Sequence, residues 1–137
     1  MKKKMIIIGG GISGIYLSIL LKKYLDMDVV VLEANDKPLK KLLATGNGRC
    51  NLSNKDLDKA HYGGDIKPWV NDIIHDFDIV EALKDIGLYT KYMGNLLYPY
   101  SESAKAVQTL FLNRAEEFGV KIICDEEVLS IKKSKHG

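Results

Sequence analysis

The sequence contains few of the residues from which metal sites and disulfide frameworks are built. Only two cysteines occur among its 137 residues, Cys50 and Cys124, and neither has metal-ligand spacing around it. The three histidines, His61, His75 and His136, form no recognisable catalytic triad or ligand set. We therefore expect no metal site, reduced thiols in a cytoplasmic protein, and surface or packing roles for the histidines.

Long apolar runs and a strong excess of one charge are also missing. No uninterrupted apolar segment reaches the roughly 20 residues that cross a bilayer. Lys2-Lys3-Lys4 imitates the basic start of a secretory signal, but glycines interrupt the apolar run behind it and no small-residue cleavage site follows. The net charge of +2 gives no reason to propose a nucleic-acid partner. We expect one cytoplasmic domain with neither a membrane nor a nucleic acid as partner.

The most informative feature that is present is the start of the chain. An apolar run at residues 5–8 leads into Gly9-Gly10-Gly11-Ile12-Ser13-Gly14 and then into a helical pattern over residues 14–25. In a dinucleotide-binding turn, the first glycine allows a sharp turn, the second allows a pyrophosphate near the backbone, and the third allows close packing of helix on strand. Gly9, Gly11 and Gly14 are predicted to have these three roles.

A second strand over residues 28–33 ends on an acid. Glu33 lies 33 − 14 = 19 residues beyond Gly14, close to the roughly 20 that separate this turn from a ribose-binding carboxylate. An acid at this position accepts hydrogen bonds from free ribose hydroxyls and repels a 2′-phosphate. The pattern therefore favours an adenosine with an unmodified ribose, as in FAD or NAD, over NADP.

The rest of the chain alternates between helical and extended patterns. Two short helices are expected over residues 66–76 and 79–86, an extended segment over 88–100, a long helix ending at Phe118, and a third strand over 120–124. The long helix should bury Ala104, Val107, Phe111 and Ala115 on one face. The predicted fold class is α/β, a Rossmann-like three-layer fold of the FAD- or NAD(P)-binding kind with a parallel sheet.

A fourth strand is expected over residues 128–133, directly after the third. Two strands in succession leave no room for a crossover helix and indicate the start of a β-meander, so we expect a truncated domain. With strand order 3-2-1, the first strand would be an exposed edge. We expect homodimerisation or another partner to cover it, and a monodisperse monomer in light scattering would count against this.

The segment between residues 41 and 54 carries a specific resemblance. Together with residues 7–14, Leu32-Glu33 and Tyr98-Pro99-Tyr100-Ser101, the stretch Lys41-Leu42-Leu43-Ala44-Thr45-Gly46-Asn47-Gly48-Arg49-Cys50-Asn51-Leu52-Ser53-Asn54 resembles a family of flavoprotein oxidoreductases. That family includes bile-acid dehydro-reductases of the BaiN type and aminoacetone-oxidase-like enzymes. The Gly-Arg or Gly-Lys pair that many relatives carry just before Lys41 stands here as Leu39-Lys40.

The resemblance implies an extended FAD and assigns residues to it. The pyrophosphate would lie on Gly9, Gly11, Ser13 and Gly14, the adenine ribose on Glu33, and the ribityl and flavin end along Lys41, Thr45, Gly46, Arg49, Cys50 and Asn51. It also implies electron or hydride transfer to a small-molecule substrate, commonly at the expense of NAD(P)H. Family members are longer, so residues 1–137 would be a partial FAD-binding domain without the inserted substrate domain or the C-terminal flavin-contacting segment.

Other readings of the same residues remain open. The chain could be a non-catalytic, truncated dinucleotide-binding domain, or an NAD-binding module. Arg49 could pin its loop through a salt bridge, and Cys50 could be a small packing residue. No acid–base residue can be assigned, and this chain alone is expected to be inactive as an enzyme.

Overall fold

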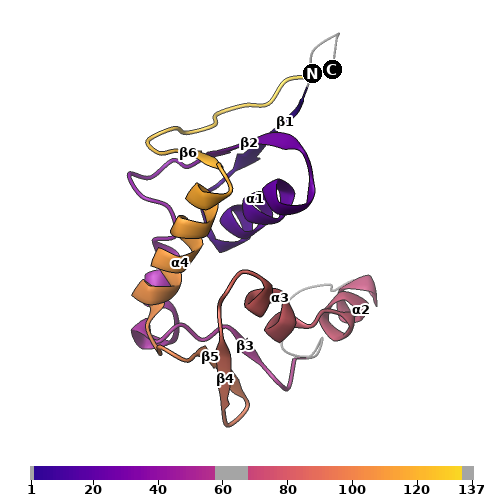
Figure 1. The fold of residues 1–137 in the computed structure, drawn as a ribbon, viewed down its shortest axis with the longest axis vertical. Helices are drawn as coiled ribbons and strands as arrows, with labels where there is room; N and C mark the ends of the chain where they lie inside the picture. Colours follow the sequence, from indigo (N-terminus) through magenta and orange to yellow (C-terminus); the bar gives the residue numbers. More distant parts are fainter. Residues whose placement is uncertain (1, 58–67, 134–137) are drawn as a thin grey trace. The chain divides into compact units, whose positions relative to one another are not determined.

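The structure is a computed structural model that describes residues 2–57 and 68–133 (Figure 1). The chain divides into two compact units. The first unit contains residues 1–43 and 111–137, and the second contains residues 44–110.

The first unit is built on a parallel sheet. Its strands are β1 (Lys3–Ile8), β2 (Met27–Leu32) and β6 (Lys121–Ile123), in the order β1-β2-β6. Helix α1 (Ile12–Tyr24) connects β1 to β2, and all six residues of β1 pair in register with β2. The predicted α/β fold, its parallel sheet and its strand order are confirmed. Helix α1 begins two residues earlier than the sequence pattern indicated.

One face of this sheet carries the core of the unit. Ile7 of β1 and Val29 and Val31 of β2 are buried, as are Ile15 and Ile19 of α1. Successive side chains of a strand point to opposite faces, so the other face receives the remaining strand residues. On that face Ile6 is 55% exposed and Ile8 is 53% exposed. Strand β1 is therefore an edge strand with an open apolar face among the described residues.

The fourth strand predicted over residues 128–133 is absent. Described residues beyond β6 form no strand, and Leu129 and Ile131 are 85% and 80% exposed. The turn just before them bonds instead to the segment after β2, through Asp125 N–H to Asn35 O (3.0 Å) and Glu126 N–H to Glu33 O (2.9 Å). A strand exists only as part of a ladder, and residues 128–133 have no ladder partner in the described chain.

The second unit contains a small antiparallel sheet of order β3-β5-β4. Strands β4 (Thr90–Met93) and β5 (Leu96–Pro99) form a hairpin, and β3 (Ser53–Asn54) pairs with β5. The sequence predicted one extended segment over these residues and missed the reversal. Gly94 has φ +62°, and Gly94-Asn95 between two extended runs is the signal of a two-residue hairpin turn.

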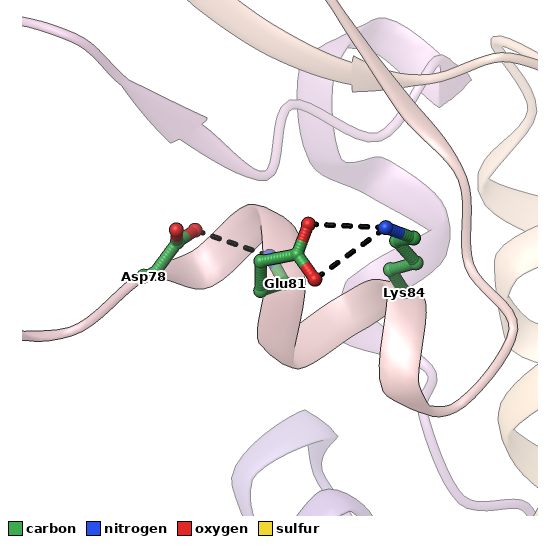
Figure 2. A network of polar contacts seen from close by, with 3 residues as sticks. All are labelled: Asp78, Glu81 and Lys84. Carbon is green, nitrogen blue, oxygen red and sulfur yellow. Dashed lines mark hydrogen bonds and ion pairs between the residues drawn. The ribbon is translucent and has the colours of Figure 1, made fainter.

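Two short helices precede the hairpin, as predicted. Helix α2 spans Pro68–Asp76 of the described residues, and α3 (Ile79–Asp85) is followed by Gly87 at φ +88°. Figure 2 shows why α3 begins at Ile79: the Asp78 carboxylate accepts a hydrogen bond from the Glu81 N–H at 3.1 Å. One turn later, the Lys84 ammonium lies 3.2 Å from the Glu81 carboxylate (Figure 2).

Helix α4 (Ala104–Glu117) also matches its prediction. The Ser103 hydroxyl accepts a hydrogen bond from the Ala106 N–H at 3.2 Å, and Gly119 follows the helix at φ +71°. The four residues assigned to its buried face are all buried: Ala104, Val107, Phe111 and Ala115. Within the first unit, the Phe111 ring meets the Tyr16 ring edge to face, with centroids 6.1 Å apart.

Candidate functional site

The turn between β1 and α1 has the geometry that its glycines predict. Gly9 has φ +102°, a conformation that favours glycine, and its N–H donates to Leu32 O at 2.8 Å. A Cβ at Gly14 would lie 2.1 Å from Gly9 O, so only glycine lets α1 start this close to the end of β1. The sharp turn and the close packing are both present.

Gly11 differs from its neighbours, because nothing in the described chain requires a glycine there. Its φ of −72° suits any residue, and a Cβ would meet no atom within 4 Å. Gly11 is the N-cap of the 13-residue α1 and makes no side-chain cap to the helix, and Ser13 is exposed in the first turn. The first N–H groups of a helix and the positive end of its dipole favour an anion. The N-terminus of α1 at Gly11 is therefore suited to an anion such as a pyrophosphate.

The Glu33 carboxylate follows β2 and is held on both of its oxygens. Oε2 accepts from the Gly10 N–H at 2.6 Å, and Oε1 accepts from the Asn35 N–H at 2.9 Å and from Asn35 Nδ2 at 2.5 Å. These bonds favour the charged form, so the bonds from Asn35 are the main reason that the pKa of Glu33 lies below its usual range. Glu33 is only 8% exposed. The acid predicted to bind ribose is thus ionised and fixed.

Sequence reasoning assigned no role to Gly10 and Asn35, yet both shape this site. A Cβ at Gly10 would lie 3.0 Å from Glu33 Oε2 and 3.1 Å from the Cβ of Pro38. The run of three glycines was a signal that the middle one also carries a constraint. Asn35 had no comparable signal, because its contact depends on how the chain turns after Glu33.

Leu39 occupies the position at which the resemblance described above implies a glycine. It has φ +60°, which L side chains rarely adopt, and its N–H donates to Gly10 O at 2.8 Å. Its side chain is 2% exposed. The left-handed turn is therefore kept without the glycine, and the buried leucine side chain offsets its strain.

In the second unit, the loop from Thr45 to Asn51 is folded on itself. A Cβ at Gly46, which has φ +56°, would lie 2.6 Å from Asn51 N, and the Cys50 N–H donates to Thr45 O at 3.0 Å. The Cys50 side chain is fully buried, and this burial raises the pKa of its thiol. Its position agrees with the packing role named above.

Arg49 leaves this loop as a half-exposed cation. Its guanidinium carbon lies 5.2 Å from the centre of the Tyr98 ring, and Nη1 lies 3.9 Å from Glu102 Oε2. The other oxygen of Glu102 accepts from Lys91 Nζ at 2.6 Å, and these contacts lower the pKa of Glu102. Glu102 itself has φ +45°. Arg49 thus has the neighbours that a loop-pinning residue needs.

The predicted cofactor residues fall into both units. The first unit contains the glycine turn, Ser13, Glu33 and the exposed Lys41, and the second contains Thr45, Gly46, Arg49, Cys50 and Asn51. Among described residues, no group of three His, Cys, Asp or Glu side chains could hold a metal ion. His75 lies on α2, whereas His61 and His136 lie outside the described residues. No described helix combines the length and apolarity needed to span a membrane.

The glycine turn and the rest of the chain match a known protein family. Residues 3–137 match the HI0933-like protein Rossmann domain. The chain belongs to the HI0933-like Rossmann domain family. The resemblance to FAD-dependent oxidoreductases is confirmed, and with it FAD as the cofactor of the HI0933-like domain. The residues of the first unit fit that cofactor, since they offer an open helix N-terminus and an ionised carboxylate.

Curated relatives of the HI0933-like domain include two kinds of enzyme. A 3-dehydro-bile acid delta(4,6)-reductase from Clostridium scindens is 37% identical over 135 residues, which cover 96% of this chain and 33% of that protein. A ribosomal RNA dihydrouridine synthase from Haemophilus influenzae is 28% identical over 133 residues, which cover 93% of this chain and 32% of that protein. The chain spans about a third of the length of these relatives.

Solved structures share the fold at low sequence identity. THI4 from Thermovibrio ammonificans has a TM-score of 0.57 and is 16% identical, with 90% of this chain and 37% of that chain covered. The oxygenase MHPCO, in its Y270F mutant, has a TM-score of 0.51 and is 18% identical, with 96% and 34% covered. These structures support the Rossmann-type fold.

Proposed function

We propose that this chain is the N-terminal, nucleotide-binding part of an FAD-dependent oxidoreductase. In this proposal the ADP half of FAD binds to the first unit. The pyrophosphate lies against the N-terminus of α1, and the adenine ribose donates hydrogen bonds to Glu33. The residues that would hold this half are Gly9, Gly11, Ser13, Gly14 and Glu33.

The observation that carries the proposal is the glycine at position 11. Gly9 is explained by its φ, Gly14 by the nearby Gly9 O, and Gly10 by the nearby Glu33 and Pro38. Gly11 has neither a special φ nor a neighbour within 4 Å of a built Cβ. A ligand that approaches the backbone supplies the missing reason, and the helix N-terminus makes that ligand an anion.

For the second unit we propose contacts with the ribityl chain and the flavin. Arg49 of this unit offers a cationic donor, as does Lys41 of the first unit, and Gly48, with no atom within 4 Å of a built Cβ, leaves backbone open to a flat ring. Thr45, Gly46, Cys50 and Asn51 would shape the same loop, Cys50 through its backbone because its side chain is buried. FAD, when bound, supplies the electron or hydride transfer, and these residues bind and orient it.

The activity of the whole protein is proposed from its relatives. Their names describe a bile-acid reductase and a ribosomal RNA dihydrouridine synthase, and the first is the more similar of the two. We propose reduction of a small-molecule substrate in the cytoplasm, with NAD(P)H as electron donor. The remaining two thirds of the relatives' length would supply the substrate site, so this chain alone would lack turnover.

The open edge of β1 is the surface where we propose a partner. Unpaired backbone groups and the exposed Ile6 and Ile8 make it suited to a second copy of this chain or to another part of the whole protein. Sedimentation of the purified chain at several concentrations tests the homodimer. A monomer at all concentrations would exclude it.

Absorbance spectra and FAD titration of the purified chain test the cofactor site. We expect saturable FAD binding, followed by flavin fluorescence and calorimetry. Gly11→Val should abolish it by filling the space for the pyrophosphate, whereas the matched control Cys50→Ser should bind FAD as the native chain does. Retained FAD affinity in Gly11→Val would contradict the assignment of the pyrophosphate site. NADH binding without FAD binding would favour an NAD module, and binding of neither would favour a non-catalytic remnant.

A further inference from the structure

Among the described residues, the contacts of the Glu33 carboxylate are all hydrogen-bond donors. None of these contacts is an acceptor to which a protonated carboxyl group could donate. Three N–H groups point at it, two from Asn35 and one from Gly10, at 2.5 to 2.9 Å. An ionised carboxylate has about four acceptor sites on its two oxygens. Oε1 has two donors and Oε2 has one, so the remaining acceptor site is on Oε2.

The backbone that carries these donors is itself fixed. Asp125 N–H donates to Asn35 O at 3.0 Å, and Glu126 N–H donates to Glu33 O at 2.9 Å. On the other side, the Gly10 carbonyl accepts from Leu39 N–H at 2.8 Å. Asn35 is consequently held in place on its backbone, and its side chain is free to serve the carboxylate.

The charged and titratable groups around Glu33 come from two segments. Lys40, in the turn that follows β2, lowers the pKa of Glu33 and forms an ion pair with Asp36. Cys124 and Asp125 follow β6, and burial, followed by the Asp125 and Glu33 charges, raises the pKa of the Cys124 thiol. In the described contacts, no hydrogen-bond acceptor from either segment contacts the Glu33 carboxylate.

Resting on the function proposed above, we propose that Asn35 is the positioning residue of the ribose site. By holding Oε1 with two donors, it keeps the Glu33 carboxylate oriented so that the remaining acceptor site of Oε2 accepts from one ribose hydroxyl. The same arrangement makes Asn35 a specificity residue, because a carboxylate without a proton to donate repels a 2′-phosphate. ADP-ribose and 2′-phospho-ADP-ribose are the probes that read this difference.

The test compares the whole chain with its Asn35→Asp variant by calorimetry from pH 5 to pH 8. The native chain should bind ADP-ribose equally well across this range and 2′-phospho-ADP-ribose about a hundredfold more weakly, because an uncompensated charge is costly. At pH 8 the variant has two facing carboxylates and no side-chain donor. At pH 5 the pair shares a proton, so the hydroxyl of the introduced carboxylic acid replaces the lost Nδ2 donor.

We therefore expect Asn35→Asp to bind ADP-ribose about tenfold more tightly at pH 5 than at pH 8, since one hydrogen bond to a charged group is regained. Ala34→Asp adds the same charge at the neighbouring exposed position and should keep the flat profile. A flat profile in Asn35→Asp, whether weakened or native in strength, would assign Asn35 a merely structural role and overturn the proposal. An affinity that falls toward pH 5 would overturn it as well.

Carboxyl carbon NMR without nucleotide separates this proposal from the proposed function. In the native chain Glu33 should titrate below its ordinary pKa, and in Asn35→Asp the pair should take up a proton between pH 5 and pH 8. If both titrations behave in this way but the native chain binds no ADP-ribose, the ribose site itself is wrong, and the proposal falls with it. If ADP-ribose binds and the variant pair takes up no proton in that range, only the role of Asn35 is wrong.

Discussion

The glycine turn of the first unit and the loop from Thr45 to Asn51 of the second are both rich in glycine, but for different reasons. Each has one glycine packed against backbone, Gly14 and Gly46, and each also has glycines with open space at the Cβ position, which are Gly9 and Gly11 in the first unit and Gly48 in the second. Gly48 has φ +82°, so its conformation alone explains it, whereas Gly11 has an ordinary φ. The comparison teaches that an open glycine points to a ligand only when its backbone conformation does not already require glycine.

The packed glycine of the first unit should show the largest effect. In Gly14→Ala, the new Cβ would lie 2.1 Å from Gly9 O, so helix and strand must separate. We expect the free energy of unfolding to fall by about 3 kcal/mol in urea titrations. Gly11→Ala is the matched control and should change stability by less than about 0.5 kcal/mol. Equal losses in the two variants would contradict the distinction between packed and open glycines.

Leu39 should show an effect of similar size, with an unusual order of stability between its alanine and glycine variants. Leu39→Ala removes a buried side chain while keeping the left-handed backbone, and should cost about 3 kcal/mol of unfolding free energy. Leu39→Gly removes the same side chain but relieves the strain at φ +60°, so it should be more stable than Leu39→Ala by about 1 kcal/mol. Chemical denaturation of both variants measures the difference, and the ordinary order, with alanine above glycine, would show that no strain is stored here.

Glu33→Gln changes the hydrogen bonding of the first unit at nearly constant shape. In glutamine an NH₂ group replaces one carboxylate oxygen, so this group would face the N–H donor of Gly10 or those of Asn35 and could not accept from them. We therefore expect a loss of about 2 kcal/mol of unfolding free energy at pH 7. The pKa of Glu33 is lowered in the folded state, so its contribution is complete above the unfolded pKa and is lost as pH falls through the folded one. The native chain should therefore lose stability below about pH 4.5, and the variant should lose less over the same range.

Glu102→Gln should have the smallest effect, because the ion pairs that it removes are partly exposed. Lys91 and Arg49 would each lose an anion, at 2.6 and 3.9 Å. We expect a small, salt-sensitive decrease in the urea midpoint and a greater mobility of the Arg49 side chain in NMR relaxation. If the mobility of the Arg49 side chain is unchanged in the variant, its stacking on Tyr98 alone holds it in place.

Much of the first unit could be predicted because its signals are local. The order of β1, α1 and β2 follows from residue periodicity, and the positions of Gly9 and Gly14 follow from how a strand turns into a helix. The buried face of α4 was predicted for the same reason. The strand predicted at residues 128–133 was wrong, since alternation of apolar residues indicates that a strand can form but not that a partner is present. The hairpin at Gly94-Asn95 was missed although its turn residues are a local signal.

The sequence by itself determined the α/β fold, the parallel sheet and the family, because glycine spacing, apolar periodicity and the acid after β2 are properties of neighbouring residues. Only the tertiary structure decided how Glu33 is used. Its donors come from Gly10, 23 residues earlier, and from a turn pinned by residues 125 and 126. It also decided that Leu39 takes a glycine's conformation and that Arg49 faces Tyr98 and Glu102. Such contacts join residues far apart in the chain, so no local pattern contains them.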